Sequence, residues 1–328
     1  IKASDVKKLR DLTGAGMMDC KKALAETNGD FEAATDILRK KGQKIAAKRA
    51  DRDAKEGVVL GGQSADGKKA YIVCLNCETD FVAKTDSFVK FTQDILKAAI
   101  DNDVNDAETL KALPYNQGTI NDEIINQNGV IGEKIELGCF LKIEGEFTVV
   151  YNHMGNKLTA MAAFNKAFDA QGAKNVAMQI AAMNPLALDE SEISQEMKDR
   201  ELAVAIDKTK AEQIQRQVEV AIKKAGINPA HVDSEDHINS NMSKGWITEE
   251  QAATAREIIA KVSAEAAAAL KEEQIQKIAQ GRLNKFFKES TLLNQDYEQD
   301  NKMSVRQYIQ SVDKEATVTC FKRFGLAN

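Results

Sequence analysis

Apolar and polar positions alternate along residues 69–76, where Tyr71, Val73 and Leu75 share one face at a period of two. This alternation predicts a half-buried β-strand. A different pattern follows in residues 86–100, where apolar side chains recur at the spacing of one helical face. The apolar positions of this predicted helix are Phe88, Phe91, Ile95, Leu96 and Ala99. The chain therefore passes from a strand into an amphipathic helix through a short corner.

The corner between this strand and this helix has the sequence CETDFVAK at residues 77–84. It combines Thr79, which is suited to capping a helix, with the carboxylate of Asp80, the large ring of Phe81 and the small aliphatic Val82. A segment this short between two anchored elements cannot bury all four side chains. We therefore expect an exposed Asp-Phe pair that acts as a wedge with a charge beside it. Two other interpretations stay open, with Phe81 as a core residue and Asp80 as the helix cap.

The order strand, turn, strand, helix occurs twice in the chain. The first copy is predicted at residues 58–60, 64–67, 71–77 and 86–100, and the second at residues 147–151, 155–156, 158–164 and 173–183. Each hairpin is expected to bury one face beneath its own helix, which gives an α+β core of two related halves. Between the copies, residues 105–127 are predicted to be mostly helical and residues 134–143 to form a further strand.

Three short helices are predicted before the first strand. The first carries Val6, Leu9 and Leu12, the second covers residues 18–27, and the third runs from Asp30 to Gly42. They predict a compact three-helix bundle. The basic run that follows has no aromatic side chains for base stacking, which favours a solvated linker helix. Contact of this run with RNA or with an acidic partner surface stays open.

After Pro185 the strand signals stop and long charged helical segments follow. Helical spacing at residues 191–225 and 248–270, on either side of a polar turn at residues 228–245, predicts a protruding antiparallel helical hairpin. The last predicted elements are helices at residues 271–287 and 305–309 and a strand at residues 318–324. The expected domains are the bundle (1–42), a linker helix (43–56), the first half of the core (57–144), the first part of its second half (145–190), the helical hairpin (191–270), and the completion of the second half with a C-terminal module (271–328).

Composition narrows the class of protein. The chain has 328 residues, of which 43% are hydrophobic and 29% are charged. No apolar run approaches the ~20 residues that a membrane helix needs. The net charge of −5 lacks the basic field that nucleic-acid binding usually requires, so direct nucleic-acid binding is not expected. Five scattered cysteines suit free thiols, and no basic, apolar leader precedes Ser4. We expect a cytoplasmic protein without disulfides or a membrane segment.

Cys74 and Cys77 have the one spacing that suggests redox or metal chemistry. A zinc site needs a second pair of ligands, and His153, His231 and His237 do not supply one. A redox pair should open a helix, whereas Cys74 lies within the predicted strand, and a period of two points the two thiols to opposite faces. We favour packing roles for both thiols. We expect no cofactor, no metal site and no catalytic residues.

The segments TGAGMMDCKKAL at residues 13–24, NCETDFVA at residues 76–83 and GRLNKF at residues 281–286 follow one another in this order. Together they closely resemble the bacterial elongation factor Ts family, whose members are guanine-nucleotide exchange factors of elongation factor Tu. The family is also expected to carry Gln-Pro-Phe where this chain has NQDY at residues 294–297. The region of residues 211–270 looks longer than in compact members.

The resemblance implies a fold and a mechanism. The bundle resembles a ubiquitin-associated (UBA) domain, and the helical hairpin implies a coiled coil that contacts the partner or forms a homodimer. Thr79, Asp80, Phe81 and Val82 would bind elongation factor Tu, in its GDP-bound and nucleotide-free states, and displace its magnesium ion. GDP would then leave and GTP reload, with no bond chemistry. The further partner contacts that the resemblance implies are Met17, Met18, His153, Gly281, Arg282 and Phe286.

Two other classes of function stay open. A binding adaptor or chaperone-like scaffold would grip a client with the bundle and self-associate through the hairpin, and it would copurify with clients in the absence of elongation factor Tu. A thiol oxidoreductase would use Cys74 and Cys77 and would reduce insulin. Neither class accounts for the segments at residues 13–24 and 281–286.

Overall fold

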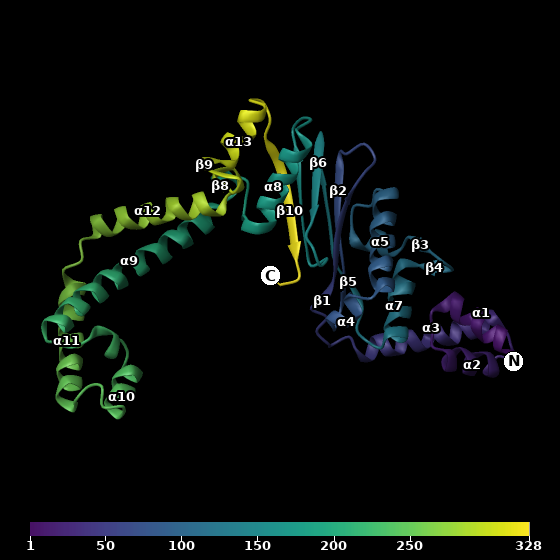
Figure 1. The fold of residues 1–328 in the computed structure, drawn as a ribbon, viewed down its shortest axis with the longest axis horizontal. Coiled ribbons are helices and arrows are strands. Elements are labelled where there is room, and N and C mark those ends of the chain that lie inside the picture. Colours follow the sequence, from purple (N-terminus) through teal and green to yellow (C-terminus); the bar gives the residue numbers. More distant parts are fainter. Residues whose placement is uncertain (328) are drawn as a thin grey trace. The chain divides into compact units, whose positions relative to one another are not determined.

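The computed structural model describes residues 1–327 and combines helices with small antiparallel sheets, in agreement with the predicted α+β class (Figure 1). The chain forms two compact units. The first unit consists of Ile1–Leu188 and the segment from Gln295 onward. The second unit is Asp189–Asn294.

The first unit begins with a three-helix bundle of α1 (Ala3–Thr13), α2 (Met17–Glu26) and α3 (Phe31–Lys48). Gly14 ends α1 in the left-handed conformation, with φ of 70°, which glycine adopts without a steric penalty. Asp30 caps α3 by accepting a hydrogen bond from a backbone N–H of its first turn. The buried core of the bundle consists of Val6, Leu9, Ala15, Cys20, Ala23, Leu24, Ala34 and Leu38.

The expected end of the third helix at Gly42 is wrong, because α3 continues to Lys48. Gly42 faces helix α7 (Ile120–Ile131), and a Cβ atom on it would lie 2.9 Å from the backbone oxygen of Ile125. Gly129 of α7 meets the backbone of Gly42 at the same crossing. The glycine is therefore a point of close helix packing and not a stop signal. The segment predicted as a linker helix begins as the last part of α3 and continues as a turn into the first strand.

Two three-stranded antiparallel sheets form the core of the first unit. The first, in the order β1-β2-β5, consists of β1 (Glu56–Gln63), β2 (Lys69–Cys77) and β5 (Glu136–Glu144). The second, in the order β10-β7-β6, consists of β6 (Phe147–Asn152), β7 (Leu158–Phe164) and β10 (Val318–Gly325). Helix α5 (Asp86–Asp101) covers β1 and β2, and α8 (Ala170–Met183) covers β6 and β7, so each predicted hairpin carries its own helix.

Strand β2 is buried on both faces, so the expected half-buried strand is wrong. Tyr71 and Val73 pack toward α5 as predicted, but Ile72 and Cys74 on the other face are also fully buried. The second sheet covers this other face, and Met161 of β7 lies in the same apolar cluster. Strand β2 is therefore fixed between a helix and a sheet.

The segment between α5 and β5 is less helical than expected. It contains α6 (Ala107–Lys111), a small hairpin of β3 (Pro114–Tyr115) and β4 (Gly118–Thr119), and then α7. A helix cannot continue through Pro114, and Asn116 turns the chain with a φ of 50°. The predicted strand after α7 is confirmed as β5.

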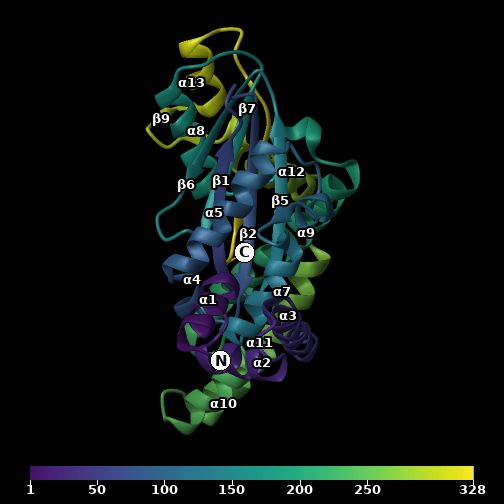
Figure 2. The same cartoon turned by 90° about the vertical axis from the view of Figure 1, so that its right-hand side faces the viewer.

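The last part of the first unit packs on α8, as Figures 1 and 2 both show for β9 and α13. It consists of β8 (Asp296–Tyr297), β9 (Asp300–Ser304), α13 (Val305–Val312) and β10. The buried amide of Gln179 donates to the carbonyl of Asp296 at 2.9 Å and accepts from the N–H of Glu298 at 2.9 Å. The rings of Tyr297 and Tyr308 stack at 4.0 Å. The NQDY segment at residues 294–297, where the chain departs from the Gln-Pro-Phe expected of the family, is thus firmly packed.

The second unit is helical. Its elements are η1 (Glu190–Glu192), α9 (Gln195–Lys224), η2 (Pro229–His231), α10 (Glu235–Ser243), α11 (Glu249–Ala268), α12 (Glu272–Ser290) and η3 (Leu292–Asn294). Helix α9 packs against both α11 and α12. The expected polar turn at residues 228–245 is wrong, because it contains α10, whose Ile238 joins the buried core with Ile222 and Ala252.

Candidate functional site

The corner after β2 forms α4 (Asp80–Ala83), a helix of one turn that directly precedes α5 in the sequence. Thr79 has an extended backbone and caps α4, because its Oγ1 accepts a hydrogen bond from the N–H of Val82 at 3.4 Å. The predicted capping role of Thr79 is confirmed. Ala83 is buried and Val82 packs on the core beneath α5, so these two side chains anchor the turn.

Phe81 is 80% exposed to solvent, and it is the one exposed phenylalanine within residues 1–327. A single helical turn has one face on the core, which Val82 and Ala83 occupy, so Phe81 points to solvent. The alternative of a core phenylalanine is wrong. Exposing a ring of this size costs hydrophobic free energy that the isolated chain does not recover, so the ring is available for contact with another molecule.

Asp80 lies beside Phe81 in the first turn of α4 and accepts a hydrogen bond from Nζ of Lys84 at 2.7 Å. This hydrogen bond holds the pKa of Asp80 below its ordinary value. The carboxylate is therefore charged at neutral pH. The exposed ring thus has a fixed anion and its paired cation next to it.

His153 is exposed in the turn between β6 and β7, and its Nδ1 lies 2.8 Å from the hydroxyl of Tyr151. The neighbouring Met154 is 87% exposed. This turn and the Phe81 corner lie at the same end of the first unit: the N–H of Val59, in β1, donates to the carbonyl of Asn156 at 2.7 Å, and β1 packs against α4. The structure therefore brings His153 into the neighbourhood of Thr79, Asp80, Phe81 and Val82.

Met17 and Met18 are 48% and 74% exposed at the start of α2. Helix α2 packs on the body of the bundle, whereas α4 lies near the opposite end of α3 (Figure 1). The two methionines thus form a separate exposed surface of the first unit.

Gly281, Arg282 and Phe286 lie on α12 in the second unit. Gly281 is exposed within the helix, and a Cβ atom there would meet nothing within 4 Å in the described residues. Arg282 pairs with Glu212 of α9, and the half-buried ring of Phe286 lies 5.8 Å from that of Phe287. The ion pair with Glu212 thus accounts for Nη2 of Arg282, but its Nη1 is buried without a hydrogen-bond partner among the described residues. Packing gives no reason for a glycine at position 281.

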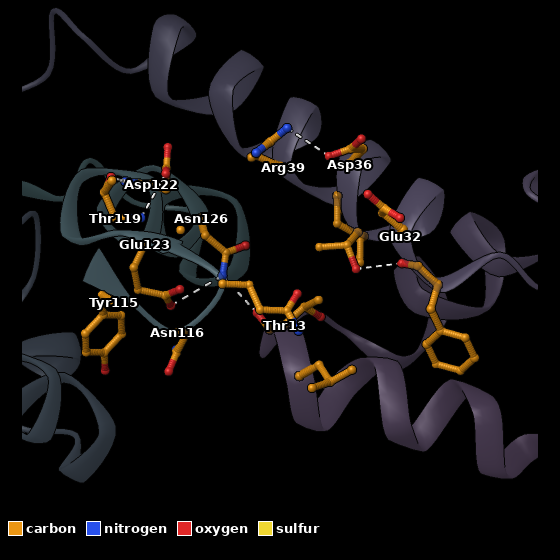
Figure 3. Close-up of a pocket in the computed structure, with 16 residues that line it drawn as sticks. Thr13, Glu32, Asp36, Arg39, Tyr115, Asn116, Thr119, Asp122, Glu123 and Asn126 are labelled. Atoms are coloured by element: carbon orange, nitrogen blue, oxygen red, sulfur yellow. Dashed lines mark hydrogen bonds and ion pairs between the residues drawn. The ribbon is translucent and has the colours of Figure 1, made fainter. Parts of the chain in front are cut away.

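A groove of about 630 Å³ lies between the bundle and the β3–β4 hairpin with α7 (Figure 3). The side-chain amide of Asn126 crosses it and donates to the backbone carbonyl of Thr13 at 2.8 Å. Burial raises the pKa of Glu123, which lines the same groove. None of the site residues predicted from sequence line this groove. Its two walls come from segments about a hundred positions apart, so no local sequence pattern indicates it.

Cys74 and Cys77 are both fully buried, in different apolar clusters on opposite faces of β2. Burial raises the pKa of each thiol to about 12, so both stay protonated and weakly nucleophilic. This environment argues against an oxidoreductase. Within residues 1–327, Cys20, Cys74, Cys77 and Cys139 are free thiols, and no group of three or more histidine, cysteine or acidic side chains is placed to hold a metal ion. Within the same residues, no helix combines the length and apolarity needed to cross a membrane.

Comparison with known proteins gives consistent matches over nearly the whole chain. A family model described as "Elongation factor TS" matches residues 78–219 and 204–328. A protein of Bacteroides thetaiotaomicron named "Elongation factor Ts" is 56% identical over 324 residues, covering 98% of both chains. Proteins of the same name from Porphyromonas gingivalis and Christiangramia forsetii are 42% and 40% identical, over 98% and 99% of this chain and 97% and 98% of their own length. The chain belongs to the elongation factor Ts family.

Proposed function

We propose that this protein is a guanine-nucleotide exchange factor that binds elongation factor Tu and releases its GDP during translation, without making or breaking a covalent bond. Membership of the elongation factor Ts family supports the role in elongation. The observation that carries the proposal is Phe81, which is 80% exposed on a capped turn anchored by two packed neighbours. A rigid, exposed ring is suited to enter a slot in another protein.

The mechanism follows from linkage. A factor that binds the nucleotide-free partner more tightly than the nucleotide-bound partner weakens nucleotide binding by the same free energy. Phe81 would enter an apolar slot beside the magnesium and phosphate site of elongation factor Tu. The resulting shift would dislodge the magnesium ion, whose charge neutralises the phosphates. GDP would then leave, and GTP would rebind and expel the factor.

The partner surface would include more than the corner. Thr79, Asp80, Phe81 and Val82 would form its centre, with His153 beside them. The N-terminal bundle, which we propose to be a UBA-like domain, would contact the partner through the exposed Met17 and Met18. On α12, Gly281, Arg282 and Phe286 would form a further contact, with the glycine allowing a partner backbone to approach closely. We propose a cytoplasmic location for this activity.

The helices of the second unit suit a coiled coil that would contact the partner or join two copies of the chain, because α9 packs along both α11 and α12. We propose the same domains that we expect from the sequence, with the bundle, the two core halves and the helical hairpin as separate domains. Light scattering of the chain, alone and mixed with elongation factor Tu, measures whether one copy or two take part.

The test of the exchange function is the release of a fluorescent GDP from elongation factor Tu, followed by stopped flow over a range of factor concentrations. Phe81→Ala is expected to slow release at saturating factor by about 30-fold, which corresponds to the ~2 kcal/mol typical of a central contact residue. Val312→Ala removes another exposed apolar side chain of the first unit and serves as the control. Release by Phe81→Ala at the unmodified rate, with unchanged affinity, would show that the wedge mechanism is wrong.

A further inference from the structure

Three segments of the first unit meet at the base of the Phe81 corner. One is the turn between α3 and β1, the second is the end of β2, and the third is the connection between α7 and β5. The residues that join them are Arg49, Arg52, Glu78, Thr79, Glu133 and Lys134. None of these contacts involves neighbours in the sequence, so the corner is held from outside its own strand and helix.

Glu133 holds the residues that precede α4. Its Oε2 accepts hydrogen bonds from the backbone N–H groups of Glu78 and Thr79 at 3.0 and 3.1 Å. Its Oε1 accepts the hydroxyl hydrogen of Thr79 at 2.7 Å. The same hydroxyl oxygen accepts from the N–H of Val82, so the hydroxyl proton points to Glu133 and the lone pair points into α4. One carboxylate therefore fixes both the backbone and the cap of the turn that carries Phe81.

Glu78 makes the reciprocal contacts. Its Oε1 accepts from the N–H of Lys134 at 2.7 Å and from Arg49 at 3.1 Å, and its Oε2 accepts from Arg52 at 3.1 Å. The ammonium group of Lys134 in turn donates to the carbonyls of Ala50 and Arg52 at 2.9 and 3.0 Å. The carboxylates of Glu78 and Glu133 thus both accept from several hydrogen-bond donors. Charge-assisted hydrogen bonds of this kind are stronger than neutral ones.

A single helical turn cannot hold a direction by itself, because one turn fixes several backbone dihedrals for few hydrogen bonds. The apolar anchors Val82 and Ala83 fix the distance of α4 from the core, but Phe81 lies on the opposite side of the turn. The orientation of the ring therefore depends on how the first residues of the turn are held. These are the residues that Glu133 contacts.

We propose that Glu133 is a positioning residue that sets the direction in which α4 presents Phe81, and that Glu78 extends this hold to the end of α3, so that the N-terminal bundle and the corner form one rigid piece. The inference rests on the proposed exchange function. A contact between the bundle and the partner would therefore also orient Phe81, because the same hydrogen bonds join the bundle to the corner.

The test compares Glu133→Ala and Glu133→Gln with the control Glu146→Ala, which removes an exposed carboxylate in the β5–β6 turn. Glu133→Ala is expected to lower the maximum rate of GDP release from elongation factor Tu about tenfold, because a misplaced ring loses most of the roughly 30-fold effect expected of Phe81 as a central contact residue. The half-saturating concentration should change far less. Glu133→Gln keeps an acceptor oxygen and should retain most of the rate, and the control should be unchanged. A full rate for Glu133→Ala overturns the inference.

Two further readouts separate a positioning role from a general loss of stability. In the Phe81→Ala background, Glu133→Ala should cause no further loss of rate, because it acts through the ring; a further loss overturns the inference. Hydrogen–deuterium exchange of the peptide covering residues 78–84 should be faster in Glu133→Ala than in the control, and equal exchange also overturns it. If Glu133→Ala does not fold, Thr79→Val removes the hydroxyl that Glu133 holds and should give the same pattern.

These outcomes distinguish the two proposals. If Phe81→Ala itself releases GDP at the unmodified rate, the exchange mechanism fails, and the hydrogen-exchange measurement alone decides the positioning role of Glu133. If Phe81→Ala is slow and Glu133→Ala is not, the exchange mechanism stands and the positioning inference fails.

Discussion

Lys157 pairs with Glu56, with 3.6 Å between Nζ and Oε2. Lys157 follows the turn that carries His153, and Glu56 is the first residue of β1, the strand that packs against α4. Lys157 also contributes to the electrostatic environment of Asp80. The ion pair thus ties together two exposed segments that belong to different sheets.

His153→Ala is expected to weaken binding to elongation factor Tu about tenfold, because the side chain lies on the same end of the unit as Phe81 and interface residues of moderate importance contribute more than ~1 kcal/mol. Isothermal titration calorimetry with the nucleotide-free partner measures this affinity. His237→Ala, on the second unit, is the matched control. An unchanged dissociation constant for His153→Ala would remove this histidine from the proposed surface.

Gly42→Ala is expected to lower the free energy of unfolding by about 1–3 kcal/mol, the usual cost of adding atoms to a closely packed contact. The new Cβ would lie 2.9 Å from the backbone oxygen of Ile125, and a backbone atom cannot rotate away. Urea unfolding followed by circular dichroism gives the value. Gln43→Ala changes the next, exposed position of α3 and should stay close to the parent. Equal stability of Gly42→Ala and Gln43→Ala would contradict the close approach of α3 and α7.

Asp103 accepts hydrogen bonds from Lys142, Lys69 and the hydroxyl of Tyr71, and these contacts hold the pKa of its carboxyl far below the ordinary value. Because the folded pKa lies below the unfolded value of ~3.9, the charged carboxylate stabilises the fold, and this contribution is complete above about pH 5. It is lost as the pH falls toward the folded pKa.

Asp103→Asn is therefore expected to lower the free energy of unfolding at neutral pH and to flatten its decline between about pH 5 and pH 2. Denaturant unfolding at a series of pH values measures both effects. Asp11→Asn, at an exposed position of α1, is the control. A variant with the same acid dependence as the parent would show that these contacts do not bias the protonation of Asp103.

The sequence predicted the corner well because its determinants are local. A strand, a helix and the few residues between them are enough to place Thr79 as a cap and Phe81 in solvent. The same reasoning predicted the two hairpins with their helices and the final strand. The residues named for partner contact remain predictions, although their exposure on the folded chain is consistent with that role for Phe81, Met17 and Met18.

The features that sequence patterns missed depend on distant segments. The second face of β2 is covered by a sheet formed much later in the chain, so alternation alone indicated a solvated face. Gly42 ends no helix because α7 packs on it. Ile238 lies in a mostly polar stretch, and it is buried because it joins a core with Ile222 and Ala252 from other helices of the second unit. Glu133 contacts residues more than fifty positions away, and no local pattern marks such an acid.

Strand β10 pairs with β7, although the whole of the helical unit separates the two in the sequence. During synthesis, β6 and β7 leave the ribosome long before their third strand exists, and one edge of β7 stays open in the meantime. Closing that edge requires a contact of high sequence separation, which is slow to form. Completion of the second sheet, and with it the support beneath the His153 turn, is therefore a late step in the folding of this chain.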